Sequence, residues 1–180
     1  MNHKPKIYLF LLLLTSLIIL SCNKREEFSE IPSIEYQGFV VIYNPELQIY
    51  DRGVISVKYT DGDGDIGLAQ GDTLPPYNPG SRYYYNFIIT YYELQNGVVK
   101  EVPLLSYNPT TQEYDTVSLS ARVPVLTPDG RNKAIKGTIQ DTIFIYNFNS
   151  DYDTVRFSAI LVDRALQESN EVFTPYVIRQ

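Results

Sequence analysis

Three aspartates occupy alternate positions in the segment Asp61-Gly62-Asp63-Gly64-Asp65-Ile66-Gly67. Their carboxylates can converge only if the backbone curls around a point, and the intervening glycines permit that curl. Anionic groups brought so close repel one another strongly unless they stay in solvent or a hard cation neutralises them. Calcium suits a flexible loop that offers only oxygen ligands. The segment therefore predicts a calcium site, and an acidic turn that binds no metal is the alternative.

The spacing of the three acids is similar to the first, third and fifth positions of an EF-hand loop. In that register Gly67 would offer a backbone carbonyl, and Asp72 falls at the twelfth position. Ile66 stands where an EF-hand has glycine, Asp72 is shorter than the usual glutamate, and residues 54–59 favour a strand over a helix. We therefore expect a calcium loop on a β scaffold, with Gly67 and Asp72 among its candidate ligands.

Two distant aspartates are further candidates. Asp51 precedes an expected strand, and Asp163 follows another. Loops from different strands gather at the ends of a β-sandwich, so Asp163 is included among the predicted metal ligands. Because Arg52 and Arg164 directly follow these two acids, local ion pairing or turn capping is the alternative role for both.

The N-terminus has the pattern of an export signal. Lys4 and Lys6 precede an apolar run from Ile7 to Leu20, whose length of about 14 residues suits a signal peptide but is short for a membrane span. Cys22 follows and is the only cysteine in the chain. We predict that residues 1–21 are a cleaved lipoprotein signal and that acyl chains on Cys22 anchor the protein to a membrane. An ordinary signal peptide or an uncleaved anchor is the alternative.

Composition limits the chemistry of the remaining chain. Without Lys4 and Lys6, the 15 basic residues fall to 13 against 21 acidic ones, a net charge of −8, which argues against nucleic acid as a partner. The only histidine, His3, lies in the signal. This excludes Ser-His-Asp and Cys-His catalysis and histidine-ligated metals. Carboxylate-only glycoside hydrolysis remains open.

Residues 22–33 read as a lipidated cysteine and tether, and residues 34–180 as one β domain. Short runs rich in Val, Ile, Tyr, Phe and Thr alternate with turn residues, and no sustained helical period occurs. The expected strands are Ile34–Tyr43, Gly53–Tyr59, Tyr83–Leu94, Val98–Ser106, Tyr114–Val123, Thr138–Phe148, Thr154–Val162 and Val172–Ile178. They predict an all-β, immunoglobulin-like or fibronectin-like two-sheet sandwich, with a small barrel as the alternative.

Several of the 16 tyrosines lie in the strand expected at residues 83–94. Residues at alternate positions of a strand share a face. One face should therefore fill the core, and the other, which includes Tyr92, could contact a glycan or a partner protein. The alternative is that tyrosine serves only as a strand former with a solvated hydroxyl.

Four segments carry a resemblance to known proteins. Ile19-Leu20-Ser21-Cys22 resembles a bacterial lipobox, and residues 23–27 are similar to the surface-export signal of Bacteroidetes lipoproteins. Together with residues 59–67 and 162–170, they make the chain resemble a group of uncharacterised Bacteroidetes lipoproteins. The resemblance implies a lipid-anchored β-sandwich of the outer membrane without enzyme activity. Exposure at the cell surface is left open.

Three functions follow as hypotheses. The first is a non-catalytic, calcium-stabilised binding or accessory module, facing the surface or the periplasm, whose partner is a glycan or an envelope protein. The second is a structural subunit of an envelope complex. The third is a carboxylate-dependent glycoside hydrolase, which would need two acids about 5–9 Å apart in one cleft.

Overall fold

The computed structural model describes residues 27–127 and 133–179. The predicted signal at residues 1–21, Cys22 and the first part of the tether lie outside the described residues. Within the described ranges the chain forms ten strands and one short 3-10 helix. None of the helices in those ranges is long and apolar enough to cross a membrane.

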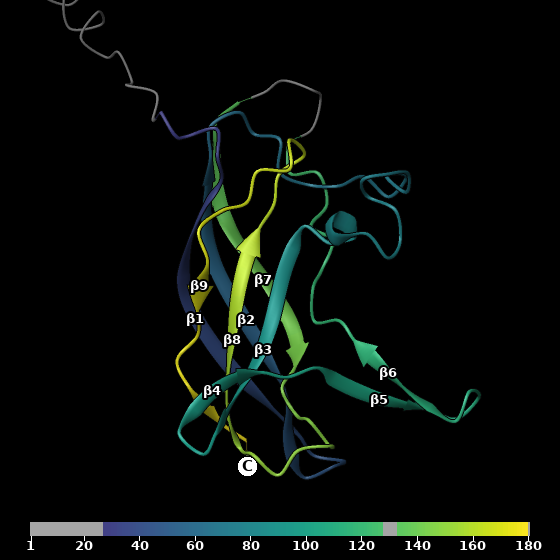
Figure 1. Ribbon diagram of the computed structural model, residues 1–180. Helices are drawn as coiled ribbons and strands as arrows, with labels where there is room; N and C mark the ends of the chain where they lie inside the picture. Colours follow the sequence, from purple (N-terminus) through teal and green to yellow (C-terminus); the bar gives the residue numbers. More distant parts are fainter. Residues whose placement is uncertain (1–26, 128–132, 180) are drawn as a thin grey trace, which may run out of the picture.

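Two antiparallel sheets form two layers, with β8 and β3 in front of β2 in Figure 1. The first sheet has the order β1-β2-β7 and consists of β1 (Ser33–Asn44), β2 (Ile49–Asp61) and β7 (Ile135–Phe144). The second has the order β10-β8-β3-β4, with β9 also paired to β8. Its strands are β3 (Phe87–Gln95), β4 (Val98–Glu101), β8 (Thr154–Leu161), β9 (Val172–Phe173) and β10 (Val177–Ile178). The all-β sandwich is confirmed; the immunoglobulin-like topology stays a prediction.

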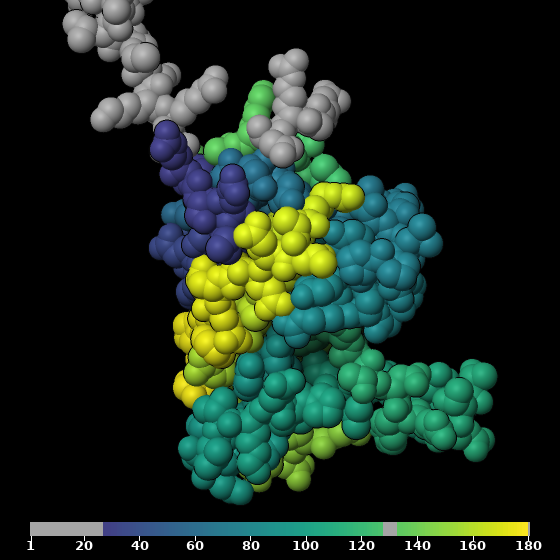
Figure 2. All heavy atoms as spheres, turned by 45° about the horizontal axis from the view of Figure 1, so that its top comes forward, coloured from purple at the N-terminus to yellow at the C-terminus, as the bar shows by residue number. Residues whose placement is uncertain are grey.

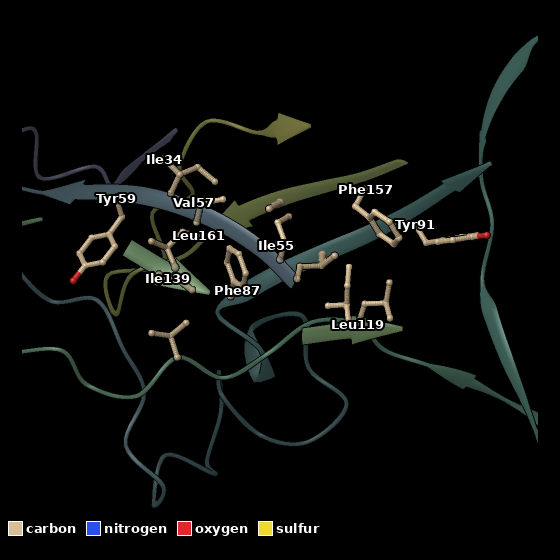
Figure 3. Close-up of a cluster of buried hydrophobic side chains, with 14 of the residues drawn as sticks. Ile34, Ile55, Val57, Tyr59, Phe87, Tyr91, Leu119, Ile139, Phe157 and Leu161 are labelled. Atoms are coloured by element: carbon tan, nitrogen blue, oxygen red, sulfur yellow. The ribbon is translucent and has the colours of Figure 1, made fainter. Parts of the chain in front are cut away.

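The core lies between the two layers (Figure 3). In β8, Val155, Phe157, Ala159 and Leu161 are all fully buried, as residues at alternate positions of a strand share one face. The ring of Phe157 stacks on Phe39 of β1 with centroids 5.2 Å apart, so aromatic packing joins the two sheets directly.

Several expected strands are interrupted or end earlier than the sequence predicted. The strand expected over residues 114–123 ends at Val117, and the one expected over residues 138–148 ends at Phe144. Residues 82–84 form the 3-10 helix η1 (Arg82–Tyr84), so β3 starts only at Phe87. The strand expected over residues 98–106 breaks at Pro103, and the one expected over residues 172–178 breaks at Pro175. Proline lacks the N–H that a sheet ladder needs, and this accounts for both interruptions.

A two-stranded ribbon of β5 (Leu104–Asn108) and β6 (Glu113–Val117) projects from the body of the sandwich (Figures 1 and 2). Tyr107 and Tyr114 pair edge to face across it, with centroids 5.4 Å apart, and both are about half exposed. The ribbon pairs with no other described strand.

The acidic loop lies at one end of the sandwich, close to two other segments of the chain. β2 ends at Asp61, and β8 ends nearby in Figure 1, where its arrowhead points to the end at which the described chain begins. The backbone N–H of Gly62 donates a hydrogen bond of 2.7 Å to the carbonyl oxygen of Ser29. The tether segment, the acidic loop and the loop after β8 therefore meet at this end.

Candidate metal centre

The three alternate aspartates do converge. Asp61, Asp63 and Asp65 each place a carboxylate oxygen within 4.8 Å of those of the other two. Asp61 is fully buried because it ends β2, where its neighbours in the strand already face the core. The expected curl of the glycine-rich loop is confirmed, and Gly64, with a φ of +74°, supplies part of it.

Several carboxylate oxygens at this end are buried without a hydrogen-bond partner among the described residues. They are both oxygens of Asp61 and one oxygen each of Asp63, Asp65 and Asp163. Asp163 lies in the loop after β8, a strand of the second sheet, and is 1% exposed. Since buried carboxylates normally accept several hydrogen bonds, five unpartnered oxygens in one region indicate a cation-binding site or protonated carboxyls.

The pKa values at this end are raised. Burial, followed by the charges of Asp63 and Asp65, raises the pKa of Asp61 to about 7. Burial raises the pKa of Asp163 to about 6, with contributions from the charges of Asp65 and Asp63. Burial and the charge of Asp63 also raise the pKa of Asp65. Asp163 is therefore within electrostatic reach of the other three acids, as predicted for a ligand from a distant loop.

Hydrogen bonds hold the two acidic loops in place. The backbone N–H of Ala165 donates to Oδ2 of Asp65 at 3.1 Å, and that of Gln167 donates to Oδ1 of Asp163 at 2.8 Å. The Thr127 hydroxyl donates to the carbonyl oxygen of Gly64 at 2.5 Å. The acids therefore have little freedom to move apart, even though their charges repel.

Gly67 closes the loop against a neighbouring segment. Its φ is +121°, and a Cβ atom there would lie 2.3 Å from the carbonyl oxygen of Pro124. The next residue, Leu68, donates its N–H to the carbonyl oxygen of Val123 at 2.9 Å. The position requires glycine for both conformation and space.

Asp72, the predicted twelfth-position ligand, does not belong to the cluster of three carboxylates. Its Oδ2 pairs with Nη1 of Arg164 at 2.5 Å and accepts the N–H of Ala69 at 2.7 Å. Arg164 lowers the pKa of Asp72 accordingly. The same guanidinium also donates to the carbonyl oxygen of Gly67 at 3.4 Å. The similarity to an EF-hand thus ends after Asp65, because an arginine engages the later two candidates.

Asp51 lies at the other end of β2 from Asp61. Its Oδ2 accepts a hydrogen bond of 2.8 Å from Nδ2 of Asn44 and lies 3.8 Å from Nε of Arg52. For Asp51 the local-pairing alternative is therefore correct, and it takes no part in the acidic cluster.

Glu93 shows what a satisfied buried carboxylate looks like in this fold. It is fully buried on the inward face of β3 and accepts four hydrogen bonds. The donors are Tyr91 at 3.1 Å, Gln95 at 2.8 Å, Asn147 at 3.1 Å and Ser150 at 2.8 Å. The sequence analysis did not single it out, although the inward alternation of β3 places it in the core. Its full set of donors makes the unpartnered Asp61 the exception.

The acidic cluster offers oxygen atoms to a hard cation. No histidine or cysteine lies in the described ranges, so these residues offer none of the nitrogen or thiolate ligands that zinc and copper prefer. None of the family models, curated proteins or solved structures compared with the chain matches it.

Proposed function

We propose that this chain is a lipid-anchored, non-catalytic binding module of the bacterial outer membrane whose β-sandwich is stabilised by a calcium ion. Asp61, Asp63, Asp65 and Asp163 are the ligands in this proposal, and Cys22 carries the lipid. The observation that carries the calcium site is the set of five buried carboxylate oxygens without a hydrogen-bond partner.

A divalent cation resolves the electrostatic conflict at this site. Burying several carboxylates is costly unless they are protonated or paired with positive charge. Arg164 is close by, but its short contact is to Asp72 and not to the cluster. A bound cation would therefore supply the positive charge that balances the buried carboxylate of Asp61.

Calcium suits this site better than magnesium. Calcium accepts six to eight oxygen ligands in flexible geometry, including bidentate carboxylates. Magnesium demands near-ideal octahedral geometry and retains water ligands. The two free oxygens of Asp61 and the single ones of its neighbours fit the less regular arrangement.

Burial supports a non-catalytic role. Asp61 and Asp163 have the raised pKa values that a glycosidase acid would need, but they are 0% and 1% exposed. A hydrolase must present its two carboxylates to a sugar in an open cleft. The burial of both groups argues against that role.

Thermal unfolding of the purified protein with calcium and with chelator tests the proposal. A ligand that binds only the folded state stabilises it, by about 2.7 kcal/mol at a hundredfold excess over Kd. For a domain of this size that corresponds to a rise in Tm of roughly 5–10 °C. An identical Tm with millimolar calcium and with chelator would overturn the calcium site.

Asp51→Asn is the matched control for substitutions in the cluster. Asp51 is also a buried carboxylate, but it has Asn44 and Arg52 as partners at the opposite end of β2. The variant should lower the Tm equally with calcium and with chelator. Asp61→Asn should instead abolish the difference between the two conditions.

The β5–β6 ribbon supports a second candidate, a structural subunit of an envelope complex. An isolated two-stranded ribbon is marginally stable in water, and this one exposes Tyr107 and Tyr114. A partner that covers the ribbon would stabilise it. Co-purification of a stoichiometric envelope protein that is lost in Tyr107→Ser would favour this candidate.

A further inference from the structure

The outer face of the second sheet carries a cluster of one arginine and three aromatic residues. Arg156 of β8 lies opposite Tyr92 of β3 in the sheet register. The Cζ atom of Arg156 lies 4.0 Å from the ring centroid of Phe173 in β9 and 5.4 Å from that of Tyr176. The rings of Tyr92 and Phe173 are 6.0 Å apart. We call these four residues the Arg156 cluster.

The cluster is accessible. Phe173 is 40% exposed and Tyr176 is 47% exposed, while Tyr92 and Arg156 are half-buried. β9 pairs only with β8 at an edge of the sheet, but a partner that lies on this face would contact the side chains of the cluster. Exposed aromatic residues grouped on one face are a common feature of interaction sites.

Arg156 is distinctive in having no acceptor among the described residues. Its Nε is buried without a hydrogen-bond partner, and no ion pair joins its guanidinium to a described acid. Glu101, which lies opposite Tyr92 on β4, forms none with it. The other described arginines all have acceptors. These are Asp51 for Arg52, Glu168 for Arg82, Asp72 for Arg164, and backbone carbonyls for Arg122 and Arg179.

This unpaired cation points to an anionic ligand. Acidic residues outnumber basic ones by 21 to 15 in the chain, so an arginine flanked by rings but by no carboxylate is unusual here. The planar guanidinium matches a carboxylate with two parallel hydrogen bonds. The net charge of −6 would repel a dense polyanion, which favours isolated carboxylates on an otherwise neutral molecule.

We propose that the Arg156 cluster binds a uronic-acid residue of a glycan. The sugar ring would pack against the exposed part of Tyr176, and its carboxylate would pair with Arg156, whose guanidinium already lies over the ring of Phe173. This inference rests on the proposed binding function and names its surface and ligand class. Arg156 and Asp163 are seven residues apart along the same strand direction, about 23 Å at the usual rise, so the two sites are physically separate.

Calorimetric titration of the purified protein tests the proposal. The probes are short oligosaccharides in which uronate residues are separated by neutral sugars, namely glucuronoxylan and hyaluronate oligosaccharides, with cello- and xylo-oligosaccharides as neutral counterparts. We expect binding of at least one uronate series and at least tenfold weaker binding of the neutral series. Absence of binding by every uronate at millimolar concentration would overturn the proposal.

Substitutions locate the site. Arg156→Gln should weaken uronate binding at least tenfold, Arg156→Lys less, and Tyr176→Ala several-fold. Arg52→Gln is the matched control, because Arg52 also stacks over a ring, Phe144 at 5.4 Å, but on the other sheet and beside Asp51. Unfolding curves confirm that each variant is folded. Equal affinities of Arg156→Gln and Arg52→Gln would place the site elsewhere.

Three outcomes separate this proposal from its alternatives. Tighter binding of an aspartate- and glutamate-rich peptide than of every uronate would overturn the glycan in favour of a protein partner. A calcium-dependent Tm without uronate binding would leave the metal site intact and remove only the Arg156 proposal. Uronate binding without any calcium effect on Tm would support the Arg156 proposal and overturn the metal site.

Discussion

The backbone N–H of Ala165 donates a hydrogen bond of 3.1 Å to Oδ2 of Asp65, and so joins two loops that lie a hundred residues apart in the chain. One loop follows β2 in the first sheet, and the other follows β8 in the second. A cation held by Asp61 and Asp163 would connect the same two layers. The proposed metal therefore links the sheets at the end where Ser29 binds Gly62.

Asp163→Asn should change stability in opposite directions under two conditions. In chelator the substitution removes a buried charge that repels Asp65 and Asp63, and we expect stabilisation on the order of 1 kcal/mol. With calcium it removes a ligand, and the calcium-induced rise in Tm should fall by more than half. Calorimetric unfolding under both conditions measures the two effects. A decrease of equal size in both would indicate that Asp163 has a purely structural role.

The chelated protein should lose stability as the pH rises from 4 to 7. Folding raises the pKa of Asp61 to about 7 and that of Asp163 to about 6, above the ordinary value of 3.8 for an aspartate. The stabilising contribution of the two protonated groups is therefore complete below about pH 3.8 and is lost as the pH rises through their folded pKa values. Calcium displaces those protons, so the stabilisation that it provides should grow over the same interval.

Unfolding midpoints measured at several pH values in chelator test this dependence. The double variant Asp61→Asn/Asp163→Asn is the control, since it retains every other titratable group. The unfolding midpoint of the wild type minus that of the variant should decrease as the pH rises toward neutral. Parallel profiles would show that the two acids do not titrate in this range in the folded chain.

Asp72→Asn tests whether Asp72 is a calcium ligand, as its position in an EF-hand loop would imply. Asp72 pairs with Arg164 outside the carboxylate cluster, at a partly exposed position. Such a pair contributes at most about 1 kcal/mol to stability, and we expect calcium affinity to change less than tenfold. Calcium titration followed by unfolding measures both quantities. A loss of affinity as large as that in Asp61→Asn would restore Asp72 as a ligand.

Cys22→Ser tests the anchor independently of the metal. We expect the wild-type chain, expressed in a bacterium with lipoprotein processing, to incorporate labelled palmitate and to fractionate with the outer membrane. The variant should incorporate none, because the serine hydroxyl does not replace the thiol that accepts the lipid. Equal labelling of both chains would exclude Cys22 as the lipidation site.

Strand alternation made much of the fold predictable. Apolar and polar residues alternate in the strand expected over residues 154–162, and Phe157 is buried there because burial alternates along a strand with a period of two. The break at Pro103 was missed since the run on either side has high strand propensity. The separate ribbon of β5 and β6 was not predicted either. The sequence of a strand pair does not show whether the pair also joins a larger sheet.

The acidic loop was predictable only in part. Local spacing indicated that Asp61, Asp63 and Asp65 converge, since glycines between them set the local backbone path. The engagement of Asp72 by Arg164 depends on contacts between residues 92 positions apart, which no local pattern encodes. The Arg156 cluster is likewise formed across strands and has no signature along the chain.

Gly67→Ala should damage both the fold and the metal site, whereas Gly71→Ala should affect neither. Gly67 has a φ of +121°, and a Cβ atom there would lie 2.3 Å from the carbonyl oxygen of Pro124. Gly71, four residues later, has no atom within 4 Å of the same position. We expect Gly67→Ala to cost about 2 kcal/mol or more, because backbone strain and steric overlap combine, and Gly71→Ala to lie within about 0.5 kcal/mol of the wild type. Since Gly67 ends the acidic loop, its variant should also bind calcium more weakly when compared at a temperature where both proteins are folded. Chemical denaturation with and without calcium measures both effects, and equal behaviour of the two variants would mean that the close approach to Pro124 does not constrain the loop.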